Sequence, residues 1–315
     1  MTPCSLVITN YNGVANGNLP RFLPRIVEAA AQCPHTDEII LVDDGSSDES
    51  CGFVQTLFPQ VRLVDLKPNR GFPTAANAGF AAARHRFVAL LSNDMVPKPD
   101  WLTFLTPHFE DPEVFAASAQ LRHEDGRPQS LRRVVVMKRG RFKRVAPPGG
   151  EPAPEQAATR RYYHAGDAWS LYDREKFEAL GGFDQLFTPF FSEDEDLFYR
   201  AWKRGWKVTY EPRAQVVHHH ECSTIFRAVN EAERERIYRA HQLLHTWKNL
   251  DDPALRAQHR LSLLVRLLTA WIYDREFYAA WHTAHGKREA LRKSRAARAA
   301  NLSDREVFRR MSAAA

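Results

Sequence analysis

Four consecutive acidic residues, Glu193–Asp196, open an amphipathic segment over residues 191–205. Negative charge at a helix N-terminus stabilises a helix, so stability alone is one explanation of this cluster. One or two acids would satisfy that requirement, however, whereas four neighbouring carboxylates repel one another and raise some pKa values. Raised carboxylate pKa values are a means of making a general base. The pattern therefore favours a functional carboxylate over a purely stabilising helix start.

Polar residues also follow two apolar, strand-like runs directly. Asp43 and Asp44 come after one run in LVDDGSSDES (41–50), and Ser92, Asn93 and Asp94 come after another in LLSNDMVPKPDWL (90–102). A carboxylate in such a position can hold Mg²⁺ or Mn²⁺, and turn N–H groups can bind a phosphate. The alternative is a pair of ordinary turns with Asp, Asn and Ser caps.

Two further segments carry weaker signals. NRGFPTAANAG (69–79) places glycines and alanines where a backbone can approach a ligand closely, although small residues also suit a helix packed on a sheet. VVHHHECS (216–223) sets three histidines after a strand-like run. Imidazole is a common metal ligand, and a solvated strand end is the alternative.

Alternating strands and helices must position these residues. Apolar strands are expected over residues 5–9, 38–42, 61–65, 86–91 and 114–121, with helices over about 20–32, 46–57, 73–84 and 99–110 between them. This order predicts an α/β fold with a parallel sheet covered on both faces, which binds ligands at the carboxyl ends of its strands. Helices over 173–180 and 191–205, strands over 207–211 and 215–219, and a helical segment over 224–315 are expected to follow.

Taken together and in this order, the motifs resemble those of family 2 nucleotide-sugar glycosyltransferases, over roughly residues 4–223. The resemblance implies a GT-A (Rossmann-like) domain at 1–223, with a mostly parallel central sheet flanked by helices, and a helical C-terminal extension at 224–315. It divides the domain into a donor half (1–120), a basic insert (121–161) and an acceptor half (162–223). The donor-binding residues it implies are Thr9, Tyr11, Asn12, Asp43, Asp44, Asn69, Gly71, Asn77, Ser92 and Asn93.

The resemblance also assigns the metal ligands and the catalytic acids. LLSNDMV falls where the family has its D-x-D motif, but Ser92 stands at the first position, so the metal depends on Asp94. His218 matches the family's metal-binding histidine, and His220 is the alternative because Glu221 replaces a family glycine. Asp194 matches the general base, Glu193 aligns beside it, and Asp196 is implied as a supporting acid.

The implied reaction is an inverting, Mg²⁺- or Mn²⁺-dependent transfer of a sugar from a UDP-, dTDP- or GDP-linked donor. The implied acceptor is a hydroxyl of a glycan or a lipid-linked saccharide, and the closest branch by analogy is rhamnosyltransferase-like, in bacterial surface polysaccharide synthesis. A sugar nucleotidyltransferase is the first rival, but TNYNGVANG carries no Arg-bearing loop after the first strand. A catalytically silent sugar-nucleotide-binding protein is the second, suggested by Ser92. A glycoside hydrolase is the third rival, but an enzyme of that class would not need the Asp-Gly-Ser turn at 44–46, which is typical of nucleotide binding.

The positive charge of the chain is concentrated in two segments. The net charge is +6 overall, with +7 in residues 121–161 and +6 in residues 283–315. The basic insert is expected to be a mobile loop that covers the diphosphate, meets an anionic acceptor or is simply solvated.

A nucleic-acid partner is not expected, because no recognised module interleaves aromatic and basic residues. Four scattered cysteines exclude a disulfide framework, and the sequence shows no signal peptide or membrane-spanning run, so a cytoplasmic protein is expected.

An apolar helical stripe lies in the C-terminal segment, followed by a run of cations. The stripe residues are Leu261, Leu264, Val265, Leu268, Trp271 and Ile272, and the cations are Lys287, Arg288, Arg292, Lys293, Arg295 and Arg298. Three partners fit this pattern: an anionic membrane surface at the inner face of the cell membrane, a second subunit in a homodimer, or the chain's own catalytic domain.

Overall fold

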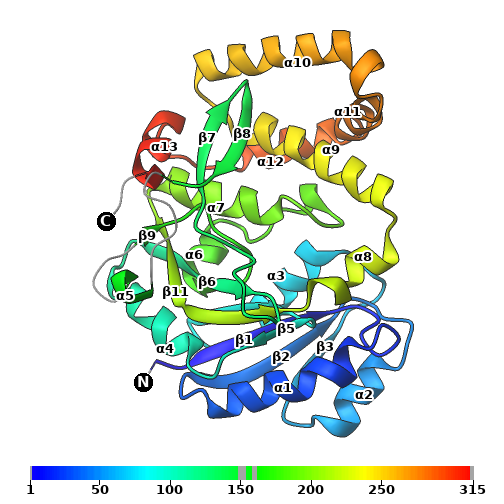
Figure 1. The fold of residues 1–315 in the computed structure, drawn as a ribbon, viewed down its shortest axis with the longest axis vertical. Helices are drawn as coiled ribbons and strands as arrows, with labels where there is room; N and C mark the ends of the chain where they lie inside the picture. Colours follow the sequence, from blue (N-terminus) through cyan, green and yellow to red (C-terminus); the bar gives the residue numbers. More distant parts are fainter. Residues whose placement is uncertain (1, 148–153, 158–161, 313–315) are drawn as a thin grey trace.

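The computed structural model describes residues 2–147, 154–157 and 162–312, and its main feature is a nine-stranded mixed sheet (Figure 1). The strand order is β3-β2-β1-β4-β10-β6-β11-β5, with β9 paired to β11. The strands are β1 (Cys4–Asn10), β2 (Thr36–Asp43), β3 (Arg62–Asp65), β4 (Phe87–Ser92), β5 (Met95–Pro97), β6 (Val114–Arg122), β9 (Tyr162–Tyr163), β10 (Ser170–Asp173) and β11 (Lys207–His218). The α/β prediction is confirmed, and residues 207–218 form one strand rather than two.

The sheet is parallel in its first half and mixed in its second. β3, β2, β1 and β4 are parallel, whereas β10 runs antiparallel to both β4 and β6. Because β6 is antiparallel to β10 and parallel to β11, the carboxyl ends of β6 and β11 lie at the same edge as those of β1, β2 and β4. The start of β10 lies at this edge too, so segments distant in sequence meet there.

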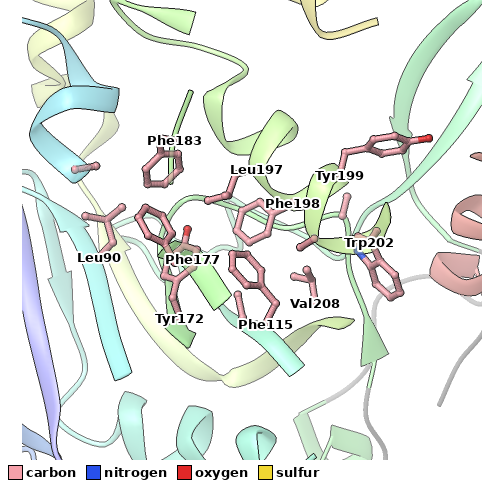
Figure 2. Close-up of a cluster of buried hydrophobic side chains, with 14 of the residues drawn as sticks. Leu90, Phe115, Tyr172, Phe177, Phe183, Leu197, Phe198, Tyr199, Trp202 and Val208 are labelled. Carbon is pink, nitrogen blue, oxygen red and sulfur yellow. The ribbon is translucent and has the colours of Figure 1, made fainter. Parts of the chain in front are cut away.

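Helices cover both faces of the sheet, as the buried strands predict. Alternate residues of β1 point to opposite faces, so Leu6 and Ile8 pack in one core cluster and Val7 in the other. The helices are α1 (Asn18–Gln32), α2 (Ser50–Leu57), α3 (Phe72–Ala82), α4 (Trp101–Leu105), α5 (Pro154–Ala157), α6 (Arg174–Ala179) and α7 (Glu193–Arg204), with 3₁₀ turns at Thr106–Glu110 and Gln185–Phe187. Figure 2 shows the cluster between the sheet and α7, where Phe115, Tyr172 and Phe198 pack together.

The basic insert is partly a folded hairpin, which corrects the expected mobile loop. Strands β7 (Val134–Lys138) and β8 (Arg141–Val145) pair antiparallel, and Val134, Val135 and Phe142 are buried in the core cluster above α7. The remaining part of the expected loop, 148–153 and 158–161, lies outside the described residues. In β8 the side chains of Phe142 and Arg144 point to one face, toward the core, while Arg141 and Lys143 point to the other.

The C-terminal segment forms helices that pack on the catalytic part. They are α8 (Thr224–Ala228), α9 (Glu231–Asn249), α10 (Pro253–Tyr273), α11 (Glu276–Gly286), α12 (Arg288–Ala296) and α13 (Asp304–Ser312), with a 3₁₀ turn at His220–Cys222 before them. Leu186 and Phe187 share a core with α9, α10 and α11, while Val307 and Met311 join the core above α7. No helix in the described part of the chain is both long and apolar enough to cross a membrane.

The apolar stripe of α10 does not pack on the catalytic domain. All six of its residues are more than half exposed, and α10 lies at the end of the molecule opposite α1 and α2 (Figure 1). Of the three partners that fit the sequence pattern, the chain's own catalytic domain is therefore not the one that covers this stripe. Three of the expected surface cations are instead used internally: Lys287 donates to Leu186 O and Thr188 O, and Arg295 and Arg298 pair with Asp251.

Candidate active site

The loops at the carboxyl edge of the sheet are tied together by buried polar side chains. Asp43, at the end of β2, accepts hydrogen bonds from Asn10 Nδ2 at 2.7 Å and from the Ser46 amide at 2.8 Å. Asn12 in turn accepts a 2.9 Å hydrogen bond from the Ser47 amide. Asp43 is fully buried in this network, so its observed role is to fix the two loops relative to each other. Its direct contact with a nucleobase stays a prediction.

Asp44 anchors the glycine loop that precedes α3. Its carboxylate accepts hydrogen bonds from the Arg70 amide at 2.9 Å and the Gly71 amide at 2.8 Å. Gly71 has φ +87°, and a Cβ there would lie 2.8 Å from Pro189 O, so only glycine fits. Asn69 lies exposed on this loop, while Thr9 is buried and Tyr11 half-buried at the end of β1. Burial raises the pKa of Asp44, and the two amides act against that rise.

Two expected donor ligands have structural roles. Asn77 donates to Phe183 O and accepts from the Phe183 amide, both at 2.8 Å, so its amide is fully engaged in joining α3 to the loop before α7. Asn93 is buried, donates to Asn10 Oδ1 at 2.6 Å and accepts from Asn18 Nδ2 at 3.0 Å. Their polar atoms are engaged with other parts of the chain here, so direct contact of these two side chains with the donor stays a prediction.

Asp94 and His218 meet where β4 and β11 end. β5 pairs antiparallel with β11 and sets Met95 opposite His218, which brings His218 Nε2 to 3.6 Å from Asp94 Oδ2. Ser92 Oγ donates to the other oxygen of Asp94. The opposite ring nitrogen, His218 Nδ1, lies 2.8 Å from Gln129 Oε1. Since Gln129 Oε1 can only accept, Nδ1 donates to it, and Nε2 is the ring nitrogen that faces Asp94.

His220 is less well placed than His218. Its exposed ring lies 5.3 Å from the His218 ring and packs at 4.5 Å against Phe226. In the described part of the chain no hydrogen bond or ion pair joins it to Asp94, although the charge of Asp94 acts against the lowering of the His220 pKa by burial. The structure thus favours His218 between the two candidates. Gln129 was not identified from the sequence, because nothing in HEDGRPQS distinguishes it from a solvated glutamine.

Glu193 and Asp194 start α7 after a backbone turn in which Phe191 and Ser192 both have positive φ, +74° and +70°. Burial, with the charge of Asp194 beside it, raises the pKa of Glu193 well above its usual range. Burial also raises the pKa of Asp194 to about 6, against the opposing effect of Arg144. The carboxylate of Asp194 accepts a 2.7 Å hydrogen bond from the Glu195 amide, which fixes its direction at the helix start.

Arg144, from the hairpin, brings a positive charge to these acids. Its guanidinium donates at 2.6 Å to Asp167 Oδ1, and His164 Nε2 lies 3.0 Å from the other oxygen of Asp167. Arg144 and His164 hold the pKa of Asp167 well below its usual range, so Asp167 stays ionised. Asp167 lies three residues before β10, at the same edge as Asp94. Asp167 was not identified from the sequence, since a single Asp in HAGDAW carries no pattern.

Asp196, predicted as a supporting acid, is held in a buried network of charges that gives it a structural role. It is fully buried and accepts hydrogen bonds from Arg200 Nε and Lys248 Nζ at 2.7 Å and from Asn249 Nδ2 at 2.8 Å. Arg200 and Lys248 hold its pKa well below the usual range, against the effect of burial. It therefore joins α7 to α9, and a part in proton transfer stays a prediction.

A cavity of about 200 Å³ adjoins the acids, between the hairpin and α9. It is lined by polar and aromatic side chains, among them Arg144, Glu195, Tyr238 and Gln242. A second cavity of about 220 Å³ shares Lys143, Tyr238 and Gln242 and continues past Arg141, Arg239 and Arg266. The two cavities make a basic groove that ends beside the start of α7.

Comparison with known families decides the class of this protein. The family model described as "Glycosyl transferase family 2" matches residues 5–181, more than half of the chain. The chain belongs to glycosyl transferase family 2. It is therefore a glycosyltransferase, as the sequence motifs predict.

Its similarity to individual family members is moderate. It is 29% identical over 257 residues to the succinoglycan biosynthesis protein ExoO of Rhizobium meliloti, covering 78% of this chain and 71% of the relative. It is 28% identical over 238 residues to the N-acetylglucosaminyl-diphospho-decaprenol L-rhamnosyltransferase of Mycobacterium tuberculosis, covering 66% and 73%. It spans only 18% of the O-antigen biosynthesis protein RfbC of Myxococcus xanthus, at 29% identity over 71% of this chain.

Solved structures share the fold at low sequence identity. S. aureus TarS 1-349 in complex with UDP aligns with a TM-score of 0.55 and 13% identity, over 99% of this chain and 90% of that one. GalNAc-T7 with UDP, GalNAc and Mn²⁺ aligns with a TM-score of 0.56 and 15% identity, over 87% and 58%. These likenesses confirm the expected GT-A fold of this family 2 glycosyltransferase.

Proposed function

We propose that this glycosyltransferase moves a sugar from a nucleotide-diphosphate donor to an acceptor hydroxyl with inversion at the anomeric carbon. The observation that carries the proposal is Asp194: a carboxylate fixed at a helix start, with its pKa raised to about 6, close enough to Arg144 and Asp167 at the start of β10 for their charges to act on it. A carboxylate with this pKa is ionised at neutral pH and is a stronger base than an ordinary aspartate.

The residues at Asp94 fit a divalent cation. His218 Nε2 and Asp94 Oδ2 both carry lone pairs and face each other at 3.6 Å, an arrangement that a cation between them would stabilise. The Gln129 contact holds the histidine in the tautomer that a metal needs. Mg²⁺ or Mn²⁺, when bound, neutralises charge on the diphosphate as the sugar–phosphate bond breaks. Asp94 and His218 are the residues that would hold it.

The chain's own groups account for the proton transfer. Asp194 accepts the proton of the acceptor hydroxyl as the oxygen attacks the anomeric carbon, and the nucleoside diphosphate departs from the opposite face. One displacement of this kind inverts the anomeric configuration. Arg144, held by Asp167, lowers the pKa of Asp194 and so favours its ionised form, while burial raises the pKa of Glu193 beside it.

The acceptor is proposed to approach along the groove between the hairpin and α9. Tyr238 offers an aromatic face to a sugar ring, and Gln242 and Glu195 offer hydrogen-bonding groups at its inner end. Lys143 and Arg141 line its outer part, which suits an acceptor that carries negative charge. The relatives named for succinoglycan and O-antigen biosynthesis, and for rhamnosyl transfer to a lipid-linked diphosphate sugar, support a glycan or lipid-linked saccharide as acceptor.

The test is a donor screen with a matched pair of variants. Purified protein is incubated with UDP-, dTDP- and GDP-sugars, with Mg²⁺ or Mn²⁺ and with a chelator, and the release of nucleoside diphosphate is measured. We expect release with one donor class, lost on chelation and reduced about 10²–10⁴-fold in Asp194→Asn, while Asp48→Asn serves as a control acid in the donor half. NMR of the product reports its anomeric configuration. A retained configuration, or equal turnover in Asp194→Asn, would refute the proposed mechanism.

A further inference from the structure

A third cavity lies between α9, α10, α11 and α12, and it shares Thr246 and His259 with the outer part of the groove. Its volume is about 370 Å³, and five arginines line it: Arg256, Arg260, Arg288, Arg292 and Arg295. Among the lining residues that the structure describes there is no aspartate or glutamate. A cavity with this lining carries a strong positive potential, which favours a bound anion.

Four of the five arginines have no partner within the described part of the chain. Arg256, Arg260, Arg288 and Arg292 make no ion pair or side-chain hydrogen bond there, in contrast to Arg295, which donates to Trp247 O and pairs with Asp251. Most other arginines of the C-terminal helices are paired, as Arg239 and Arg266 are with Asp274. Unpaired guanidinium groups around one cavity are suited to phosphate oxygens, which they bind through two parallel hydrogen bonds.

The exposed stripe of α10 adjoins this cavity. Arg260 lines the cavity, and Leu264 and Leu268 follow it at one-turn intervals on the exposed side, 53% and 66% accessible. Trp271 and Tyr273 extend the exposed surface to the end of the helix at 60% and 82%. A contiguous exposed apolar surface of this kind marks an interaction site.

We propose that α10 and the five-arginine cavity form a binding site for the phosphate groups of anionic lipids at a membrane surface. The apolar stripe inserts among the acyl chains at the interface, Trp271 and Tyr273 lie at headgroup depth, and the cavity receives a lipid phosphate. A second copy of the chain is disfavoured as the occupant, because the described rim of the cavity offers no carboxylate to another molecule's cations.

Lipid vesicles test this proposal directly. The full chain, without donor or acceptor, is sedimented with vesicles of phosphatidylcholine alone and of phosphatidylcholine mixed with phosphatidylglycerol. We expect binding to the mixed vesicles only. Arg260→Gln with Arg292→Gln is expected to weaken that binding roughly tenfold to thirtyfold, since each cation near a membrane surface contributes appreciably. Leu264→Ser with Leu268→Ser should abolish it.

The control variant is Lys98→Gln with Arg309→Gln, which removes the same charge from α13 and the loop before α4. It should bind nearly as well as the unchanged chain, and all three variants should keep its melting temperature because the altered side chains are exposed. The proposal would be overturned by equal binding to neutral vesicles, by an equal loss in the control, or by a concentration-dependent dimer that Leu264→Ser with Leu268→Ser dissolves. Stabilisation by inorganic phosphate without vesicle binding would also overturn it and leave a small-anion site. These experiments measure vesicle binding and not sugar transfer, so their outcome does not depend on whether the proposed reaction is correct.

Discussion

Arg144 donates a 2.6 Å hydrogen bond to Asp167, and this pair joins the basic hairpin to the start of β10. The guanidinium lies near enough to Asp194 to oppose the effect of burial on its pKa. The hairpin is thereby part of the active site, through one buried charge. The hairpin differs from a lid, because the Arg144–Asp167 ion pair is part of the folded protein without a bound ligand.

The pH dependence of kcat/KM should show the effect of the Arg144 charge on the Asp194 pKa. The base must be ionised, so kcat/KM is expected to fall as the pH drops through about 6, the value of the Asp194 pKa. Arg144→Gln removes a cation that lowers this pKa, so the acidic limb should move to higher pH. Arg144→Lys should restore the original limb in part. Steady-state kinetics across pH 5–8 measures both shifts, and an unmoved limb in Arg144→Gln would contradict the role given to this arginine.

Asp194→Asn should stabilise the protein while it inactivates it. A carboxyl whose pKa is about 6 when folded and near 3.8 when unfolded destabilises the fold progressively as the pH rises between these values. The cost is complete at pH 7 and at most about 3 kcal/mol. The variant should therefore gain in free energy of unfolding at pH 7 and gain less at pH 5. Urea unfolding at both pH values measures this, and an equal or smaller gain at pH 7 would speak against a raised pKa.

Metal affinity should depend on His218 and on Gln129 behind it. His218→Ala removes a ligand, and Gln129→Ala releases the ring from its orientation, which is expected to weaken Mn²⁺ binding about 10–100-fold. His220→Ala is the matched control, because in the described part of the chain no hydrogen bond or ion pair joins that ring to Asp94. Calorimetric titration with Mn²⁺ in the presence of a nucleoside diphosphate measures the three affinities. If His220→Ala loses the metal and His218→Ala keeps it, the assignment is reversed.

Asp196→Asn should destabilise the fold without a specific effect on chemistry. It leaves Arg200 and Lys248 buried with one counter-charge fewer, which costs about 3–5 kcal/mol. Thermal unfolding should show the loss, while kcat per folded molecule and its pH profile stay close to those of the unchanged chain. Glu289→Gln, at an exposed ion pair on α12, is the control and should change neither property. If folded Asp196→Asn lost most of its kcat, Asp196 would have a catalytic role.

The sequence alone determined the local features of this protein. Apolar runs separated by helical segments predicted the parallel half of the sheet, because burial on both faces requires continuous apolar strands. The same reasoning predicted that Asp94 and the acids at 193–196 are functional. Asp94 closely follows a predicted strand, and the acids begin a predicted helix. His218 could be matched by motif, but not separated from His220.

Only the tertiary structure decided how these groups are used. Asp194 and Asp196 are two residues apart in one acidic run, yet one has a raised pKa and the other is neutralised by Arg200 and Lys248. That difference depends on which neighbours the folded chain supplies, here Arg144 from the hairpin and Lys248 from α9. Likewise, the stripe of α10 has the pattern of any amphipathic helix, and its exposure depends on what packs against it. The pattern of apolar and charged residues along the chain is a local property that the sequence fixes. The burial and the charge pairing of a side chain depend on contacts between segments that are distant in the sequence.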